Sequence, residues 1–204
     1  MKFYDSLGPN PKLVRMFAAE KGFSFPQVEK VDIMTGANRQ GPYLQKNPAG
    51  QMPSLELDDG RVIAETVAIC EYLEELKPKP ALIGENAADR AETRMWTRRV
   101  EWKITQPLAD GFRFAEGLPL FKSRMRTIPE AADGLKATAR DGLAWLDEQM
   151  KGRDTIVPKR FTLADIVLFA FLEFGAGVGQ SIDPALKNLA AWFEKLKSRP
   201  SAKA

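Results

Sequence analysis

The spacing of apolar residues changes near position 80. Before it, short extended segments alternate with stretches of helical spacing, and after it every strongly patterned stretch has helical spacing. Asp58-Asp59-Gly60 supplies the turn of a hairpin between two of the extended segments, which cover 2–5, 27–33, 53–57 and 61–63. Two helical stripes accompany them, one with Leu13, Val14, Phe17 and Ala18, which Gly22 ends, and one with Ile69, Tyr72, Leu73 and Leu76. The pattern predicts the order βαβ, loop, ββα.

The second part of the chain reads as helical throughout. Lys77-Pro78-Lys79-Pro80 is typical of a linker, because each proline disfavours helix in the residue before it. Apolar residues then recur every four positions, at Trp96, Val100, Ile104 and Leu108. Further stripes run over 135–150 and 186–196. The stretch 166–172 is apolar on all sides and follows Thr162-Leu163-Ala164-Asp165, which predicts a buried helix that begins at a capping box.

Composition removes several kinds of chemistry. The 204 residues include no histidine and one cysteine, Cys70. A Ser-His-Asp triad, a Cys-His dyad, a histidine-ligated zinc or iron site, an intrachain disulfide and a cysteine-ligated zinc are therefore excluded, and we expect no metal. Cys70 lies on an apolar-flanked helical stretch without a nearby lysine, which favours a buried, inert thiol over a nucleophile.

Charge and hydropathy indicate which partners and which location to expect. The 30 Lys and Arg residues against 27 Asp and Glu give a net charge of +3, which is weak as a nucleic-acid signal, so we expect no nucleic-acid partner. The N-terminus MKFYDSLG lacks the apolar run of a signal peptide, and no apolar run approaches the ~20 residues that cross a bilayer. We expect a cytoplasmic protein with no membrane partner.

Four segments, in order, carry a family resemblance. A strand and a proline-bearing turn, 4–11, run into Val14-Arg15-Met16-Phe17-Ala18-Ala19-Glu20-Lys21-Gly22; residues 47–53 read NPAGQMP, 65–69 read ETVAI and 161–166 read FTLADI. These resemble segments of the cytosolic glutathione transferases: the VRIALAEKG helix, the NPxGQVP turn with its cis proline, the E-S-x-A-I segment and the capping box of the core helix. The resemblance covers nearly the whole chain.

The resemblance implies an α+β fold, in which a thioredoxin-like βαβ-ββα N-terminal domain precedes an all-α C-terminal domain. We expect a glutathione-binding domain at 1–77, a linker at 78–86 and a helical domain lining the electrophile site at 87–204. Family members are commonly homodimers, so a homodimer is expected. Glutathione is the implied co-substrate.

The glutathione-binding residues implied by the resemblance are Gln51, Met52, Pro53, Glu65, Thr66, Asn38 and Arg39. If the Met52-Pro53 bond is cis, the N–H and C=O of Met52 face outward and can pair with the cysteinyl backbone of glutathione. Glu65 and Thr66 open a helix whose N-terminus suits the γ-glutamyl carboxylate, while the Glu65 side chain could meet its ammonium group. The alternative for these two residues is an ordinary first-turn acid and cap. Gln51, with Asn38 and Arg39 by position, would serve the glycine carboxylate.

Classes of the family differ in the group that contacts the glutathione sulfur. Gly8 occupies the position of the serine in serine-using classes, and Gly8-Pro9-Asn10-Pro11 is most similar to a fungal and bacterial group with a GPxP turn and no catalytic Ser, Tyr or Cys in its N-terminal domain. In that group a water held by a Ser and a His of the second domain is thought to contact sulfur, and this chain has no His. Asn10 is the leading candidate, with Ser6, Tyr4 and Arg113 as rivals.

The expected function is a glutathione transferase of the detoxification type, which activates the glutathione thiol for attack on small hydrophobic electrophiles; related activities are peroxide reduction and ether cleavage. Trp102, Phe112 and Phe114 are expected as core or core-edge aromatics, some of them lining the electrophile site. The alternative is a non-catalytic glutathione-binding or interaction module with the same fold. A thiol-disulfide oxidoreductase is disfavoured, because no cysteine lies at the first strand-to-helix turn.

Overall fold

The computed structural model describes residues 1–204, and the chain divides into two compact units, 1–81 with 203–204 and 82–202. The first unit contains β1 (Lys2–Asp5), α1 (Pro9–Glu20), β2 (Gln27–Lys30), the 3-10 turn η1 (Ala37–Arg39), α2 (Gly41–Leu44), β3 (Ser54–Glu56), β4 (Val62–Ala64) and α3 (Thr66–Leu76). The second contains α4 (Ala87–Val100), the π-helical η2 (Glu101–Thr105), α5 (Gln106–Phe114), α6 (Leu118–Phe121), η3 (Pro129–Ala131), α7 (Ala132–Gln149), α8 (Leu163–Gly177) and α9 (Lys187–Lys197), and η4 (Pro200–Lys203) ends the chain. None of these helices combines the length and apolar character that crossing a bilayer requires.

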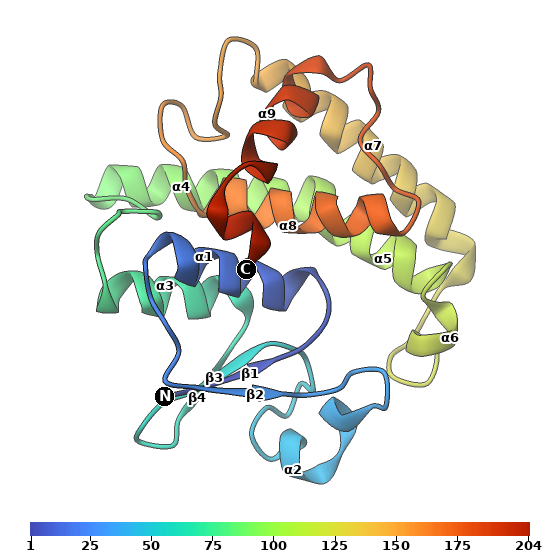
Figure 1. Ribbon diagram of the computed structural model, residues 1–204. Coiled ribbons are helices and arrows are strands. Elements are labelled where there is room, and N and C mark those ends of the chain that lie inside the picture. The colour runs from blue at the N-terminus through green and yellow to red at the C-terminus, as the bar shows by residue number, and fades with distance from the viewer. The chain divides into compact units, whose positions relative to one another are not determined.

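The first unit is built on a four-stranded mixed sheet with the order β2-β1-β3-β4. β2 runs parallel to β1, while β3 is antiparallel to both β1 and β4. Helices α1 and α3 cover one face of this sheet and α2 lies on the other (Figure 1). The predicted βαβ-ββα order and the α+β class are confirmed.

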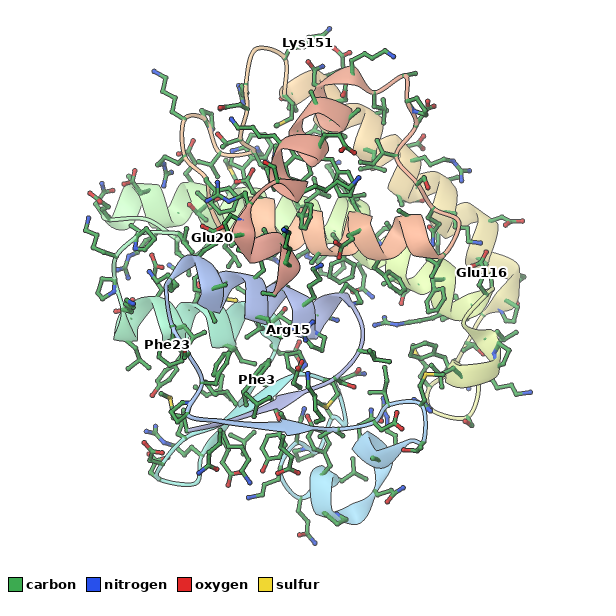
Figure 2. All side chains as sticks on the ribbon, in the orientation of Figure 1. Phe3, Arg15, Glu20, Phe23, Glu116 and Lys151 are labelled. Atoms are coloured by element: carbon green, nitrogen blue, oxygen red, sulfur yellow. The ribbon has the colours of Figure 1, made fainter.

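Alternation along β1 divides its side chains between the two faces. Phe3 is fully buried in the layer between the sheet and α1 (Figure 2), where its ring stacks on Phe25. Tyr4 points to the opposite face and forms a small core with Val31 and Tyr43. The first unit therefore has a main core under α1 and α3 and a second, smaller core under α2.

The end of α1 is fixed by hydrogen bonds and by a buried ion pair. Gly22 adopts a positive φ of 57°, and two backbone bonds close the helix, from Gly22 N–H to Ala19 O and from Phe23 N–H to Ala18 O, as the sequence predicts for a glycine stop. The Lys21 ammonium is completely buried and donates to the Glu74 carboxylate of α3 at 2.7 Å. This pair locks the end of α1 to α3, because removing either charge would leave the other buried without its ion-pair partner.

In the second unit, the four-residue apolar spacing corresponds to a change of helix type. Trp96, Val100, Ile104 and Leu108 are all buried, although four-residue steps exceed the 3.6-residue turn of an α-helix. Between α4 and α5 the chain forms the wider π-helical turn η2, which absorbs part of the rotation that would otherwise carry the stripe around the helix. The two helices therefore keep one buried face.

Helix α8 is the buried centre of the second unit, as its uniformly apolar sequence predicts, with every residue from Ile166 to Leu172 buried. The capping box is confirmed: the Thr162 side chain accepts from the first turn, and the Asp165 carboxylate accepts from Thr162 N–H at 3.0 Å. Asp165 also accepts from Ile156 N–H and from the Trp192 indole N–H, each at 3.0 Å. One buried carboxylate thus joins the start of α8 to the preceding loop and to α9.

Replacing this carboxylate should destabilise the protein strongly. In Asp165→Ala, three buried N–H groups lose their acceptor, and we expect the free energy of unfolding in urea to fall by about 3 kcal/mol or more. Asp154→Ala, which removes an exposed carboxylate paired with Lys195, is the matched control and should leave the urea midpoint unchanged. Equal midpoints for wild type and Asp165→Ala would contradict this role.

The pH dependence of the same comparison tests the state of the carboxyl group. Burial raises the pKa of Asp165 to about 6, above its ordinary value of 3.8. The folded state therefore binds this proton more tightly than the unfolded state, and the stability that protonation contributes is lost as pH rises from about 4 to 6. We expect the stability difference between wild type and Asp165→Ala to grow as pH falls through that window; a constant difference would exclude the raised pKa.

Candidate functional site

The strand register brings three chain segments to one edge of the sheet. Tyr4 pairs with Ser54 and Ser54 pairs with Ala64. The next residues, beyond the end of β1, before the start of β3 and beyond the end of β4, therefore lie at the same edge. They include three of the expected site residues, Ser6, Pro53 and Glu65.

The turn before β3 leaves a backbone donor and acceptor without partners. The Met52-Pro53 bond is cis, as the resemblance implied. Met52 is half-buried, and neither its N–H nor its C=O makes a hydrogen bond within the chain. A backbone N–H or C=O that is shielded from water is costly to leave unpaired, and a ligand that covers this turn would supply the partners. This short segment can therefore pair with an extended peptide in the manner of a strand edge.

Side chains hold the carbonyls that precede this turn. Arg39 donates to Ala49 O at 3.2 Å, and Asn38 donates to Gly50 O at 2.7 Å. Gln51 O accepts from the Tyr43 hydroxyl at 2.8 Å and from the Asn47 amide at 2.9 Å. Asn38 and Arg39 are thus placed beside the turn that carries Gln51 and Met52. The other amide atom of Asn38, its Oδ1, is buried and has no hydrogen-bond partner.

The start of α3 is open to an anion. Glu65 precedes the first helical residue, Thr66, and no side chain caps this helix N-terminus. Its first N–H groups and the positive end of the helix dipole are therefore available. Glu65 itself is exposed and has φ 70°, a conformation that non-glycine residues rarely adopt and that costs roughly 1–3 kcal/mol. Strain of this kind is typical of ligand-binding positions.

Asn10 lies in the first turn of α1, half-buried, and its side-chain amide makes no hydrogen bond within the chain. Gly8, the residue before this helix, has φ 108°, which a serine would adopt only with strain. The absence of a serine at this position therefore agrees with the local backbone. Asn10 is the polar side chain of this turn that is free to meet a ligand.

A cluster of charged side chains holds the chain between β1 and α1 in place. The Asp5 carboxylate is fully buried and accepts from Ser6 N–H at 2.8 Å. It also forms ion pairs with Arg15 of α1 and with Lys30 of β2. Asp5 thereby ties the end of β1 to α1 and to β2, and the short loop that leads to α1 and Asn10 starts from this fixed point.

The hydroxyls of the two rivals in β1 and its turn are already engaged. Ser6 is buried and donates to Val31 O at 2.5 Å. Tyr4 donates to the Glu56 carboxylate at 2.5 Å, and burial, with the contact to Glu56, raises the pKa of Tyr4. Both contacts would have to break before either hydroxyl could donate to a sulfur atom.

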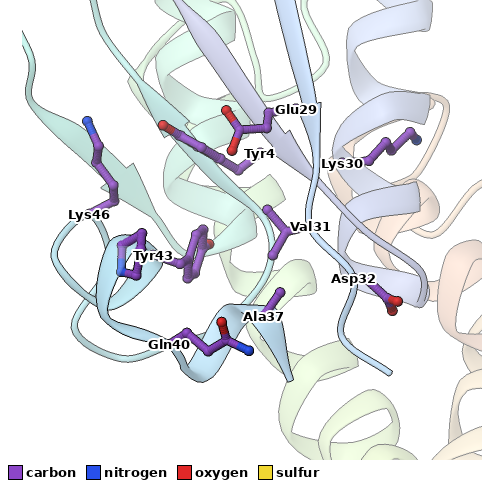
Figure 3. Close-up of a pocket in the computed structure, with 10 residues that line it drawn as sticks. Tyr4, Glu29, Lys30, Val31, Asp32, Ala37, Gln40, Tyr43 and Lys46 are labelled. Carbon is purple, nitrogen blue, oxygen red and sulfur yellow. The ribbon is translucent and has the colours of Figure 1, made fainter. Parts of the chain in front are cut away.

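Tyr4 and Tyr43 form one wall of a pocket of about 460 Å³ beside α2, together with Val31 and Ala37 (Figure 3). Charged and amide side chains, including Glu29, Lys46 and Gln40, surround this apolar surface. The rings of Tyr4 and Tyr43 meet edge to face with their centroids 5.7 Å apart. The pocket lies against the small core under α2, whose residues Tyr4, Val31 and Tyr43 are themselves buried.

The remaining expected site residues belong to the second unit. Arg113 pairs with Asp110 at 2.8 Å and lies over the ring of Phe121. Phe114 is buried and Phe112 half-buried, in edge-to-face contact with Phe121 and Phe174. Trp102 is 63% exposed, so the expectation of a core or core-edge position is wrong for this residue. It lies off the buried four-residue stripe, under the guanidinium of Arg98.

Comparison with known proteins identifies the family. The protein-family model described as "Glutathione S-transferase, N-terminal domain" matches residues 8–76. The protein-family model described as "Glutathione S-transferase, C-terminal domain" matches residues 129–195. Glutathione S-transferase 2 of Saccharomyces cerevisiae is 31% identical over 207 residues, which cover 100% of this chain and 88% of the yeast protein. The chain belongs to the glutathione S-transferase family. The protein is accordingly a glutathione S-transferase, and enzymes of this family use glutathione as co-substrate.

Solved structures agree with this assignment. A glutathione S-transferase domain-containing protein of Marinobacter aquaeolei superimposes with a TM-score of 0.93 at 35% identity, covering 98% of the transferase and 99% of that chain. Beta-etherase LigF from Sphingobium superimposes with a TM-score of 0.82 at 25% identity, covering 99% and 96% of the two chains. The predicted fold class is confirmed.

Cys70 of the transferase is fully buried on α3, and burial raises the pKa of its thiol well above the ordinary range. No cluster of three or more His, Cys, Asp or Glu side chains could hold a metal ion. The protein's own thiol therefore has neither the exposure nor the thiolate character of a nucleophile.

Thiol labelling tests the inertness of Cys70. Ellman's reagent should leave the native protein unlabelled at pH 8 and should titrate one thiol per chain after unfolding in guanidinium. Cys70→Ala should give no label in either state and should keep transferase activity. Rapid labelling of the native protein would show that Cys70 is accessible and ionised.

Proposed function

We propose that this transferase holds glutathione at the sheet edge formed by Met52, Glu65 and the first turn of α1, and activates its thiol for attack on small hydrophobic electrophiles. The observation that carries the proposal is the unpaired N–H and C=O of Met52 beside the uncapped start of α3. An extended peptide with an anionic end satisfies both features at once. Glutathione has this form, with a cysteinyl backbone at its centre and a γ-glutamyl carboxylate at one end.

The proposal divides glutathione among three groups of residues. Met52 pairs with the cysteinyl backbone next to Pro53, while the first N–H groups of α3 at Thr66 receive the γ-glutamyl carboxylate. The exposed Glu65 carboxylate meets the adjacent ammonium group. For the glycine carboxylate, Arg39 supplies a positive charge and Gln51 an amide donor.

In this proposal, Asn38 does not donate a hydrogen bond to the glycine carboxylate of glutathione. Its amide N–H already serves Gly50 O, and the atom left without a partner is an acceptor. An acceptor would repel a carboxylate. We therefore assign Asn38 to shaping the turn, and its Oδ1 to an N–H group of the glycine end.

In the chemical step, the sulfur of bound glutathione forms a bond to the electrophilic carbon. The leaving group, such as a halide, departs with the electron pair of its bond, and the thiol proton goes to solvent. Lowering the thiol pKa is the main catalytic requirement, because the thiolate is the nucleophile. Asn10 is the leading donor to that sulfur, since its amide is free and Ser6 and Tyr4 already donate to other groups. Arg113 of the second unit remains a rival through its charge.

The electrophile site belongs to the helical domain, 87–204, and its aromatic residues are Trp102, Phe112 and Phe114. Residues 78–86 form the linker between this domain and the glutathione-binding domain, 1–77. We also take the transferase to be a homodimer, as is typical of its family. A second reaction of the same site is ether cleavage, in which the thiolate attacks the ether carbon and the oxygen leaves and takes a proton. The similarity to Beta-etherase LigF favours testing it.

Binding and turnover test the proposal together. Isothermal titration should show one glutathione site per chain, and a spectrophotometric assay with chlorodinitrobenzene should show conjugation above the uncatalysed rate. An aryl ether and an organic hydroperoxide, assayed in parallel, distinguish the three reaction types. Binding without turnover on any of them would favour a glutathione-binding module, and absence of binding would overturn the site itself.

The pH profile of Asn10→Ala tests the sulfur contact. A hydrogen bond to a charged group contributes about 1.5–3 kcal/mol, so its loss should raise the pKa of bound glutathione by roughly 1–2 units. Activity at pH 6.5 should fall on the order of tenfold or more and recover toward wild type above the new pKa. Gln149→Ala, which deletes a side-chain amide at the end of α7, is the control and should leave the pH profile unchanged. An unshifted pKa in Asn10→Ala would transfer the role to Arg113 or water.

A further inference from the structure

The peptide unit between Gln51 and Met52 is held from one side only. Its carbonyl oxygen, on Gln51, accepts two hydrogen bonds, from the Tyr43 hydroxyl at 2.8 Å and from the Asn47 amide at 2.9 Å. Its N–H, on Met52, has no partner within the chain. Because a peptide unit is planar and trans, its C=O and N–H point in opposite directions. Whatever fixes the Gln51 carbonyl therefore aims the Met52 N–H.

We propose that Tyr43 is a positioning residue for glutathione, whose hydroxyl fixes the Gln51 carbonyl and thereby points the Met52 N–H at the cysteinyl carbonyl of the bound tripeptide. This inference rests on the proposed glutathione site. It assigns to Tyr43 a part in co-substrate affinity, although the side chain touches neither glutathione nor the reacting atoms.

Tyr43 is itself rigidly held. It is 6% exposed, and its ring meets the Tyr4 ring edge to face. Because its hydroxyl hydrogen goes to Gln51 O, the hydrogen bond of 3.0 Å with Ser54 is donated by the Ser54 hydroxyl. The result is a directed chain from Ser54 through Tyr43 to Gln51, in which each bond polarises the next. Burial raises the pKa of Tyr43, so its hydroxyl keeps its proton at every pH at which the glutathione thiol titrates.

The two donors to the Gln51 carbonyl have different tasks. Asn47 is four residues away in the chain and also accepts from Ala49 N–H at 3.2 Å, so it shapes the turn locally. Tyr43 connects that turn to α2 and, through Ser54, to β3. Removing the Tyr43 hydroxyl should therefore leave the turn folded but free to rotate its Gln51-Met52 peptide unit. We therefore expect the Met52 N–H to lose its fixed orientation while the protein stays folded.

Tyr43→Phe tests this assignment, because it removes one oxygen atom and keeps the buried ring. We expect the Kd for glutathione by titration, and the KM for glutathione, to rise on the order of 3- to 10-fold, the effect of one hydrogen bond. The kcat at saturating glutathione and the KM for the electrophile should stay within about twofold, because the reacting atoms are untouched. Ser54→Ala removes the bond that orients the hydroxyl and should give a smaller change of the same kind.

Tyr72→Phe is the matched control. Tyr72 is half-buried on α3 and its hydroxyl makes no hydrogen bond within the chain, so this variant should keep the wild-type Kd. Thermal unfolding of each variant separates an effect on the orientation of the Met52 N–H from an effect on the stability of the fold. A lower melting temperature for Tyr43→Phe with an unchanged glutathione Kd would show a purely structural residue and overturn the inference. If wild type does not bind glutathione, the proposed site fails instead, so the two failures are distinct.

Discussion

The structure of the first unit depends on how the backbone before the cis proline satisfies its polar groups. Three successive carbonyls, on Ala49, Gly50 and Gln51, turn toward side chains of η1, α2 and the following loop and accept their hydrogen bonds. Buried polar groups normally find partners in this way. Because the Gln51 carbonyl is held in this way, the N–H of the same peptide unit points in the opposite direction, and Met52 is left with a donor and an acceptor that nothing in the chain satisfies. A segment without regular secondary structure thereby becomes a preformed edge for a peptide ligand.

The neighbouring elements are firmly held where they support this edge and open where they face it. The buried Asp5 carboxylate, with Arg15 and Lys30, fixes the end of β1, and the buried pair of Lys21 and Glu74 fixes α1 against α3. By contrast, α3 begins without a cap at a strained Glu65, and Asn10 keeps its amide free. Rigid support under unsatisfied polar groups is the arrangement that binds a ligand with little reorganisation.

Most of the fold follows from apolar spacing, because a period of two or of about 3.6 records which side chains must be buried. The exact four-residue repeat from Trp96 to Leu108 also contained the π-helical turn, and Trp102 falls off that repeat, which is why it is exposed instead of buried. The start of α3 was predictable from the sequence, and the cis proline only from the family resemblance of NPAGQMP, because an X-Pro pair by itself does not indicate a cis bond. The partners of Tyr43 and Asp5 were not, since they join segments whose approach depends on the folded turn and sheet, and nothing in the letters marks Glu65 for a positive φ.

A crystal structure of the protein with glutathione tests the central claim most directly, because it shows which atoms the tripeptide uses. The account predicts that the cysteinyl backbone pairs with the N–H and C=O of Met52, that the Gln51 carbonyl keeps its bonds to Tyr43 and Asn47, and that the Asn10 amide lies within hydrogen-bond distance of sulfur. Glutathione bound with Met52 still unpaired, or bound away from this edge of the sheet, would contradict it.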